Sequence, residues 1–127
     1  FAGLFDPADM ASIMAGIDVL VIPSIWHENS PLTLLQALAN HTPVLVSDVP
    51  GMRDFIEPGA NGFAFPAGDT EGLAAALRPF IDDPGLAARL SRDIDYPRTS
   101  LDMARDVLAI YRSCGILPAK LTVLKGG

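Results

Sequence analysis

A carboxylate, several small polar residues and a proline lie together between two apolar segments of the chain. Glu28 is followed directly by Asn29, Ser30 and Pro31. The fixed φ of proline and its missing amide hydrogen suit the first position of a helix, and serine is a favoured cap just before it. The order of residue types therefore predicts that a strand ends and a helix begins here.

The start of this helix has the chemistry of an anion site. The first amides, on Leu32 and Thr33 with Asn29 and Ser30 just ahead, lack partners within the helix, and the helix dipole adds partial positive charge. Phosphate oxygens bind favourably at such a place. The carboxylate of Glu28 would repel a phosphate, so it fits a neutral part of the ligand that carries hydroxyl groups, such as a sugar.

Gln36 lies eight positions after Glu28, about two turns into the helix. Its amide can donate to and accept from a second polyol such as a ribose. A structural interpretation is equally open, because Gln36 can face solvent on a helix whose buried side carries Leu34, Leu35 and Leu38. A carboxylate at position 28 is likewise stabilised by the helix dipole whether or not a ligand binds.

Apolar runs and helical patterns alternate along the chain, which is typical of a parallel sheet with helices on both faces. We expect segment 18–22 to be a central strand with both faces covered. Gly51 is expected to allow a tight turn or a close main-chain approach at the carboxyl edge of this sheet. The predicted strands are 1–3, 18–22, 43–47 and 63–65, and helices are predicted to begin near positions 7, 31, 51, 70, 85 and 100.

Residues 1–84 resemble the carboxyl-terminal domain of the group 1 (family 4) glycosyltransferases. The resemblance depends on several motifs in the family's order and spacing, and covers about two-thirds of the chain. These motifs are Pro23-Ser24, Glu28 with Gln36 eight positions later, Ala37-Leu38, Pro43-Val44, Pro50-Gly51-Met52-Arg53-Asp54, Asn61-Gly62 and Pro66-Ala67-Gly68-Asp69.

The resemblance implies one half of an enzyme with two Rossmann-like domains that face each other across a cleft. It implies transfer of a sugar from a nucleotide diphosphate sugar to an acceptor, with retained configuration and without a metal or other cofactor. Glu28 is then the catalytic residue that binds the donor sugar, while Gln36 binds the ribose. The remaining substrate-binding residues are Asn29, Ser30, Pro31, Leu32 and Thr33.

Three positions depart from the family pattern. Gln36 replaces the second acidic residue of the family, which removes the stronger charge-assisted bond to ribose. Asp54 stands in place of the usual glutamate, and His41 in place of a common glycine. The family's Arg and Lys pair that contacts the diphosphate belongs to a segment before Phe1, so we expect the fragment alone to be inactive.

Length and composition fit a single domain. We expect residues 1–114 to form a partial Rossmann-like nucleotide-sugar-binding domain and 115–127 to form a tail. Fifteen acidic and nine basic residues give a net charge of −6, which argues against nucleic-acid binding. The single cysteine, Cys114, excludes an internal disulfide, and no Cys/His cluster has metal spacing.

No signal peptide and no apolar stretch of bilayer length is visible in the sequence. A cytoplasmic location is therefore expected. Attachment to a membrane surface through the missing amino-terminal acceptor domain stays open.

Two alternatives to the transferase are retained. A non-catalytic nucleotide-recognition or scaffold module is favoured by Gln36 and by the lack of basic residues near the site, whereas Glu28 in its strand-to-helix setting favours the enzyme. A weaker alternative is another enzyme of the same two-domain architecture, such as a sugar-nucleotide epimerase or a relative of glycogen phosphorylase.

Overall fold

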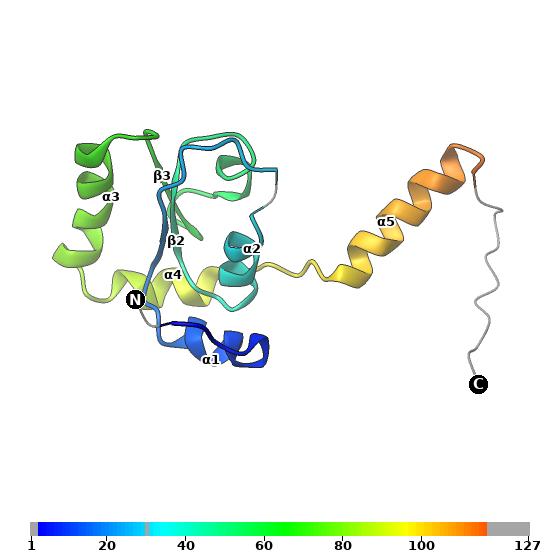
Figure 1. Cartoon of the computed structure of the whole chain (residues 1–127). Coiled ribbons are helices and arrows are strands. Elements are labelled where there is room, and N and C mark those ends of the chain that lie inside the picture. Colours follow the sequence, from blue (N-terminus) through cyan, green and yellow to red (C-terminus); the bar gives the residue numbers. More distant parts are fainter. Residues whose placement is uncertain (1–2, 30, 117–127) are drawn as a thin grey trace. The chain divides into compact units, whose positions relative to one another are not determined.

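The structure is a computed structural model that describes residues 3–29 and 31–116. The chain divides into two compact units, Phe1–Tyr96 and Pro97–Gly127. The predicted domain boundary at residue 114 stays a prediction. The first unit contains the 3-10 helices η1 (Pro7–Asp9) and η2 (Arg53–Phe55), the strands β1 (Leu20–Ile22), β2 (Val44–Ser47) and β3 (Gly62–Phe65), and the helices α1 (Met10–Ala15), α2 (Leu32–Ala39), α3 (Thr70–Asp82) and α4 (Leu86–Asp93) (Figure 1).

The predicted α/β class with a parallel sheet is confirmed. The strands pair in the order β1-β2-β3, and both pairs are parallel, with Val21 opposite Leu45 and Leu45 opposite Phe63. Parallel strands need a long crossover connection. Here α2 lies in the connection from β1 to β2, and η2 lies in the connection from β2 to β3. All three strands therefore place their carboxyl ends at one edge of the sheet, where ligands collect in open α/β folds.

The prediction that segment 18–22 forms a central strand is wrong for the described chain. β2 is the middle strand and is fully buried, whereas all three residues of β1 are only half-buried. Among described residues β1 pairs with β2 alone. The strand predicted at 1–3 falls mostly outside the described residues, and Gly3 itself is not part of a strand.

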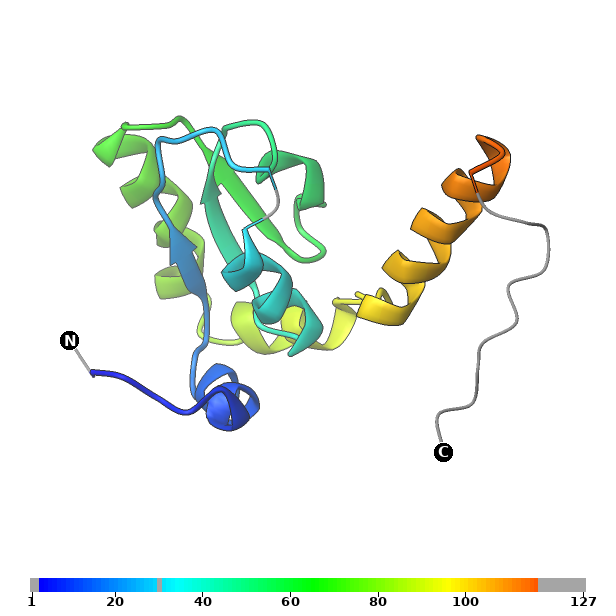
Figure 2. The ribbon, with the colours of Figure 1, turned by 45° about the vertical axis from the view of Figure 1, so that its right-hand side comes forward.

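Helices cover both faces of the sheet, as predicted (Figure 2). On one face α1, α2, the turn after β2 and the residue that ends α4 enclose the main core, built from Met14, Leu34, Ala37, Leu38, Val44, Val46, Val49, Met52 and Ile94. On the other face, Phe80 of α3 packs edge-on against Phe63 of β3, with ring centroids 6.0 Å apart. The strands are thus held in place from both sides.

His41 occupies a position where glycine is common in the family and where the backbone conformation favours glycine. It follows α2 by two residues and has a φ of 57°, the left-handed conformation that often ends a helix. A side chain in that conformation costs roughly 1–2 kcal/mol. Nδ1 of His41 lies 3.0 Å from the carbonyl oxygen of Ile94, so its ring can tie the end of α2 to the end of α4.

The second unit contains α5 (Ser100–Ser113), which begins with a complete capping box. The side chain of Thr99 accepts a bond from the amide of Asp102, and the carboxylate of Asp102 accepts one from the amide of Thr99. Met103, Val107 and Tyr111 share one face of α5, and all three side chains are exposed.

Thr99→Ala should destabilise the first turn of α5 by about 1 kcal/mol, because it removes a side-chain cap. Amide hydrogen exchange at residues 100–103 measures the effect, with Ser100→Ala as the control outside the capping box. Hydrogen bonds from Thr99 lower the pKa of Asp102 below its usual value. This stabilisation is therefore present above the ordinary aspartate pKa and is lost as the pH falls through the lowered one. Equal amide exchange at residues 100–103 in Thr99→Ala and Ser100→Ala would contradict the assignment of Thr99 as the cap of α5.

Candidate functional site

The predicted site lies in the loop that joins β1 to α2, at the carboxyl edge of the sheet. Within this loop the amide of Trp26 donates to Oγ of Ser24 at 3.2 Å, which starts a local turn. Glu28 is half-buried and Asn29 is exposed, whereas Ser30 lies outside the described residues. The structure therefore places the carboxylate-bearing residue between the strand end and the helix start, as its spacing predicts.

Pro31 caps α2 instead of occupying its first turn, which corrects the prediction by one residue. Its φ of −66° suits a helix, but its ψ of 117° is extended, so the helix begins at Leu32. The amides of Leu34 and Leu35 both donate to the carbonyl of Pro31, at 3.0 and 3.2 Å. The amides that helix geometry leaves open are those of Leu32 and Thr33, because Pro31 has none to offer.

Gln36 lies on the half-buried flank of α2. The buried face carries Leu34, Ala37 and Leu38, whereas Leu35, predicted to be buried, is half-buried. Since residues three and four apart share a helix face, Gln36 lies on the same side as Leu32 and Thr33, which are exposed. α2 therefore carries Gln36 on the same side as the side chains of Leu32 and Thr33, while the open amides of those two residues point along the helix axis at its amino-terminal end.

Gly51 makes the close main-chain approach that the sequence predicted. It has a φ of 82°, and a Cβ built on it would lie 1.6 Å from the carbonyl oxygen of Glu28 and 3.3 Å from that of Asn29. The turn after β2 is thus pressed against the loop that carries Glu28. Nothing in the local sequence identified Glu28 as the partner of this contact.

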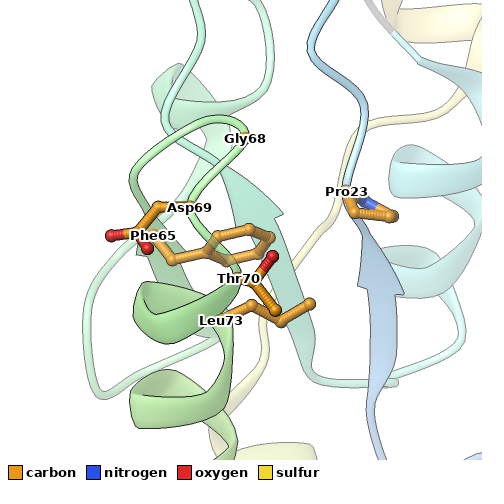
Figure 3. Close-up of a pocket in the computed structure, with 6 residues that line it drawn as sticks. All are labelled: Pro23, Phe65, Gly68, Asp69, Thr70 and Leu73. Atoms are coloured by element: carbon orange, nitrogen blue, oxygen red, sulfur yellow. The ribbon is translucent and has the colours of Figure 1, made fainter.

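A shallow hollow of about 120 Å³ lies at the same edge of the sheet, on the side of α3 (Figure 3). None of the predicted site residues lines it. Its lining consists of Pro23, Phe65, Gly68, Asp69, Thr70 and Leu73. The sequence predicted the Pro66–Asp69 run as a family motif and Asp69 as the cap of the helix that follows, but it did not predict a hollow between this strand end and helix start.

The sequence model of the family described as glycosyl transferases group 1 matches residues 1–94. The chain belongs to this family. It is 39% identical over 77 residues to a phosphatidyl-myo-inositol mannosyltransferase of Mycobacterium leprae, a match covering 61% of the chain and 21% of that protein. It is also 32% identical over 83 residues to a glycogen synthase of Mycobacterium tuberculosis, covering 65% and 20%.

Solved structures agree with this membership of the glycosyltransferase family. A sucrose-phosphate synthase from Thermosynechococcus elongatus superposes with a TM-score of 0.71 at 26% identity, covering 89% of the chain and 30% of that protein. Anabaena HepE in complex with UDP superposes with a TM-score of 0.70 at 21% identity, covering 84% and 30%. The second likeness shows the fold alone. The chain spans about a fifth of the length of its curated relatives.

Permanent positive charge is scarce in this glycosyltransferase segment. The first 52 residues contain no lysine or arginine, and the first one in the sequence is Arg53. Arg53 is already paired, with Nη1 2.8 Å from Oδ1 of Asp48. Within residues 1–52, an anion would therefore be bound by main-chain amides and not by lysine or arginine.

Within residues 3–29 and 31–116, no three His, Cys, Asp or Glu side chains are grouped so that they could hold a metal ion. No helix in that part of the chain is both long and apolar enough to cross a bilayer.

Proposed function

We propose that this chain is the donor-binding half of a glycosyltransferase that moves a sugar from a nucleotide diphosphate sugar to an acceptor, with retention of configuration. The acceptor is held by a domain outside this chain, and the chain by itself is inactive. The observation that carries the proposal is the Glu28 loop: half-buried Glu28 lies between the end of β1 and the open amides that begin α2, at the edge where the parallel strands end.

Each group has one role in this proposal. Glu28 binds hydroxyl groups of the donor sugar, and the amides of Leu32 and Thr33, with those of Asn29 and Ser30, bind the diphosphate. Gln36 binds the ribose. As the bond to the sugar breaks, negative charge grows on the departing diphosphate, and preorganised amides stabilise that charge without rearranging.

No metal ion is required in this proposal, because the amides and the dipole of α2 offset the phosphate charge. They do so only in part, since the first 52 residues supply no lysine or arginine. The remaining positive charge must come from residues outside the chain. A location inside the cell, where nucleotide sugars are available, belongs to the same proposal.

Similar proteins support a nucleotide-sugar donor. Relatives of this chain include a phosphatidyl-myo-inositol mannosyltransferase and an Escherichia coli galactosyltransferase that uses UDP-Gal. Structures of similar fold are described as complexes with UDP and with UDP-glucose. These ligands belong to those proteins, and they define the compounds with which this chain should first be tested.

The second candidate is a nucleotide-recognition module without catalysis. Gln36 in place of an acid and the lack of nearby basic residues favour it. It predicts binding of the nucleotide without turnover, so the two candidates differ in a measurable way.

The experiment that tests the proposal is a calorimetric titration of the protein at its full natural length. Its ligands are UDP, GDP and ADP, each with and without an attached hexose. We expect one nucleotide series to bind, its sugar conjugate to be consumed when an acceptor is present, and NMR of the product to show the donor's anomeric configuration. Binding without any turnover would favour the module, and absence of binding by all six ligands would contradict both candidates.

A further inference from the structure

The turn that follows β2, residues 48–54, approaches the main chain of the Glu28 loop closely at Gly51. A Cβ on Gly51 would approach the carbonyl oxygen of Glu28 to 1.6 Å. Ordinary van der Waals contact between heavy atoms is about 3.5 Å. Any side chain at position 51 therefore requires the turn and the main chain of Glu28 to move apart by more than about 1 Å.

Two side-chain interactions hold this turn closed. The amide of Gly51 donates to Oδ2 of Asp54 at 3.2 Å, and Nη1 of Arg53 donates to Oδ1 of Asp48 at 2.8 Å. Both interactions are exposed, so their contribution to overall stability is small. Their effect is geometric, because they fix the tip of the turn that touches Glu28.

The base of the turn is anchored in the core. Met52 is fully buried, and Val49 is buried beside it in the cluster under α2. Close-packed interiors transmit displacements because they contain few voids that could absorb them. The turn is therefore fixed at Val49 and Met52 by the core and at Gly51 by its bond to Asp54. The position of Gly51 then sets how closely the main chain of Glu28 can approach the sheet.

We propose that Gly51 and Asp54 are positioning residues for Glu28. Gly51 allows the contact and Asp54 fixes its geometry, so that the carboxylate of Glu28 stands where the donor sugar binds. The proposal rests on the function proposed for Glu28. Binding constellations tolerate errors of about 0.5 Å, and a misplacement of 1 Å can cost about 100-fold in rate.

The main test compares Gly51→Ala with Gly59→Ala in the protein at its full natural length. The two glycines have nearly the same φ, 82° and 80°, but a Cβ on Gly59 meets nothing within 4 Å. Both variants thus carry the same backbone strain, and only Gly51→Ala displaces Glu28. We expect Gly51→Ala to weaken binding of UDP-glucose about tenfold more than binding of UDP, and Gly59→Ala to leave this ratio unchanged. Equal ratios in the two variants would overturn the proposal.

A second pair of variants applies if Gly51→Ala does not fold. Asp54→Asn keeps a side-chain oxygen that can accept the bond from the amide of Gly51, whereas Asp54→Ala removes it. We expect the ratio of UDP-glucose to UDP affinity to fall in Asp54→Ala and to be retained in Asp54→Asn. Indistinguishable variants would contradict a positioning role.

Amide hydrogen exchange of residues 26–29 without ligand separates this inference from the proposed function. Exchange should be faster in Gly51→Ala and Asp54→Ala than in Gly59→Ala and Asp54→Asn, because only the first two loosen the loop. If this difference occurs but no nucleotide sugar binds the wild type, the proposed function is wrong and the main-chain contact stands. If nucleotide sugars bind and exchange is equal in all variants, the positioning inference is wrong.

Discussion

Replacing Glu28 by glutamine should lower kcat/KM for the nucleotide sugar by about 10²- to 10³-fold in the protein at its full natural length. Glutamine keeps the size of the side chain but loses its charge, and hydrogen bonds to a charged group contribute about 1.5–3 kcal/mol each. Glutamine still forms neutral hydrogen bonds of about 0.5–1.5 kcal/mol, so each exchanged bond loses roughly 1–1.5 kcal/mol. Since 1.36 kcal/mol corresponds to a factor of ten in rate, two or three such bonds give the expected loss. Steady-state kinetics with the preferred donor measures it.

The same variant should bind the free nucleoside diphosphate as well as the wild type does, because that ligand lacks the sugar. Gln36→Ala is expected to weaken the diphosphate and its sugar conjugate equally, since both contain ribose. Glu57→Gln is the matched control, because Glu57 is exposed and belongs to the turn before β3. A Glu28→Gln enzyme with unchanged kcat/KM, or with equal losses for both ligands, would contradict the assigned role.

Gly62→Ala should destabilise the first unit by about 3 kcal/mol, the upper end of the range for overpacked buried sites. Gly62 is buried opposite Val44 in the register of β3 with β2. A Cβ there would lie 2.0 Å from the carbonyl oxygen of Val44 and 3.0 Å from its Cγ2. Relief requires β3 to move away from the middle strand, which weakens the sheet on which the site is built.

Urea denaturation followed by circular dichroism measures this loss against a total stability of about 5–15 kcal/mol, as is usual for domains. Gly16→Ala is the control, because the nearest atom to its Cβ is the carbonyl oxygen of Ile13 at a relaxed 3.5 Å. That variant should stay within about 0.5 kcal/mol of the wild type. A Gly62→Ala variant equally close to the wild type would show that β3 shifts without cost.

Much of the site was predictable because its signals are local in the sequence. The junction at Glu28 and Pro31 follows from residue types whose preferences act within one turn of helix, and the structure places a helix start there. Its first residue differed by one, because the φ of proline suits both a cap and a first turn, and only ψ separates the two. The close approach at Gly51 was also predictable, since glycine is favoured where main chains meet.

Contacts between distant segments were not predictable. His41 adopts a left-handed backbone and bonds the carbonyl of Ile94, which is 53 residues away. Strand β1 is as apolar as a central strand, yet it lies at the edge of the described sheet, because pairing depends on which strands are present. The apolar composition of a strand indicates that it can be buried, but it does not indicate which strands pair with it.

The sequence by itself determined the α/β class, the order of the elements and the family, because these depend on periodic patterns and motif spacing. Only the tertiary structure decided that the carbonyl of Glu28 lies against Gly51 and that none of the predicted site residues lines the hollow beside α3. The physical reason is that periodicity assigns a residue to a face of its own element, whereas contact between elements depends on packing, which no single segment encodes.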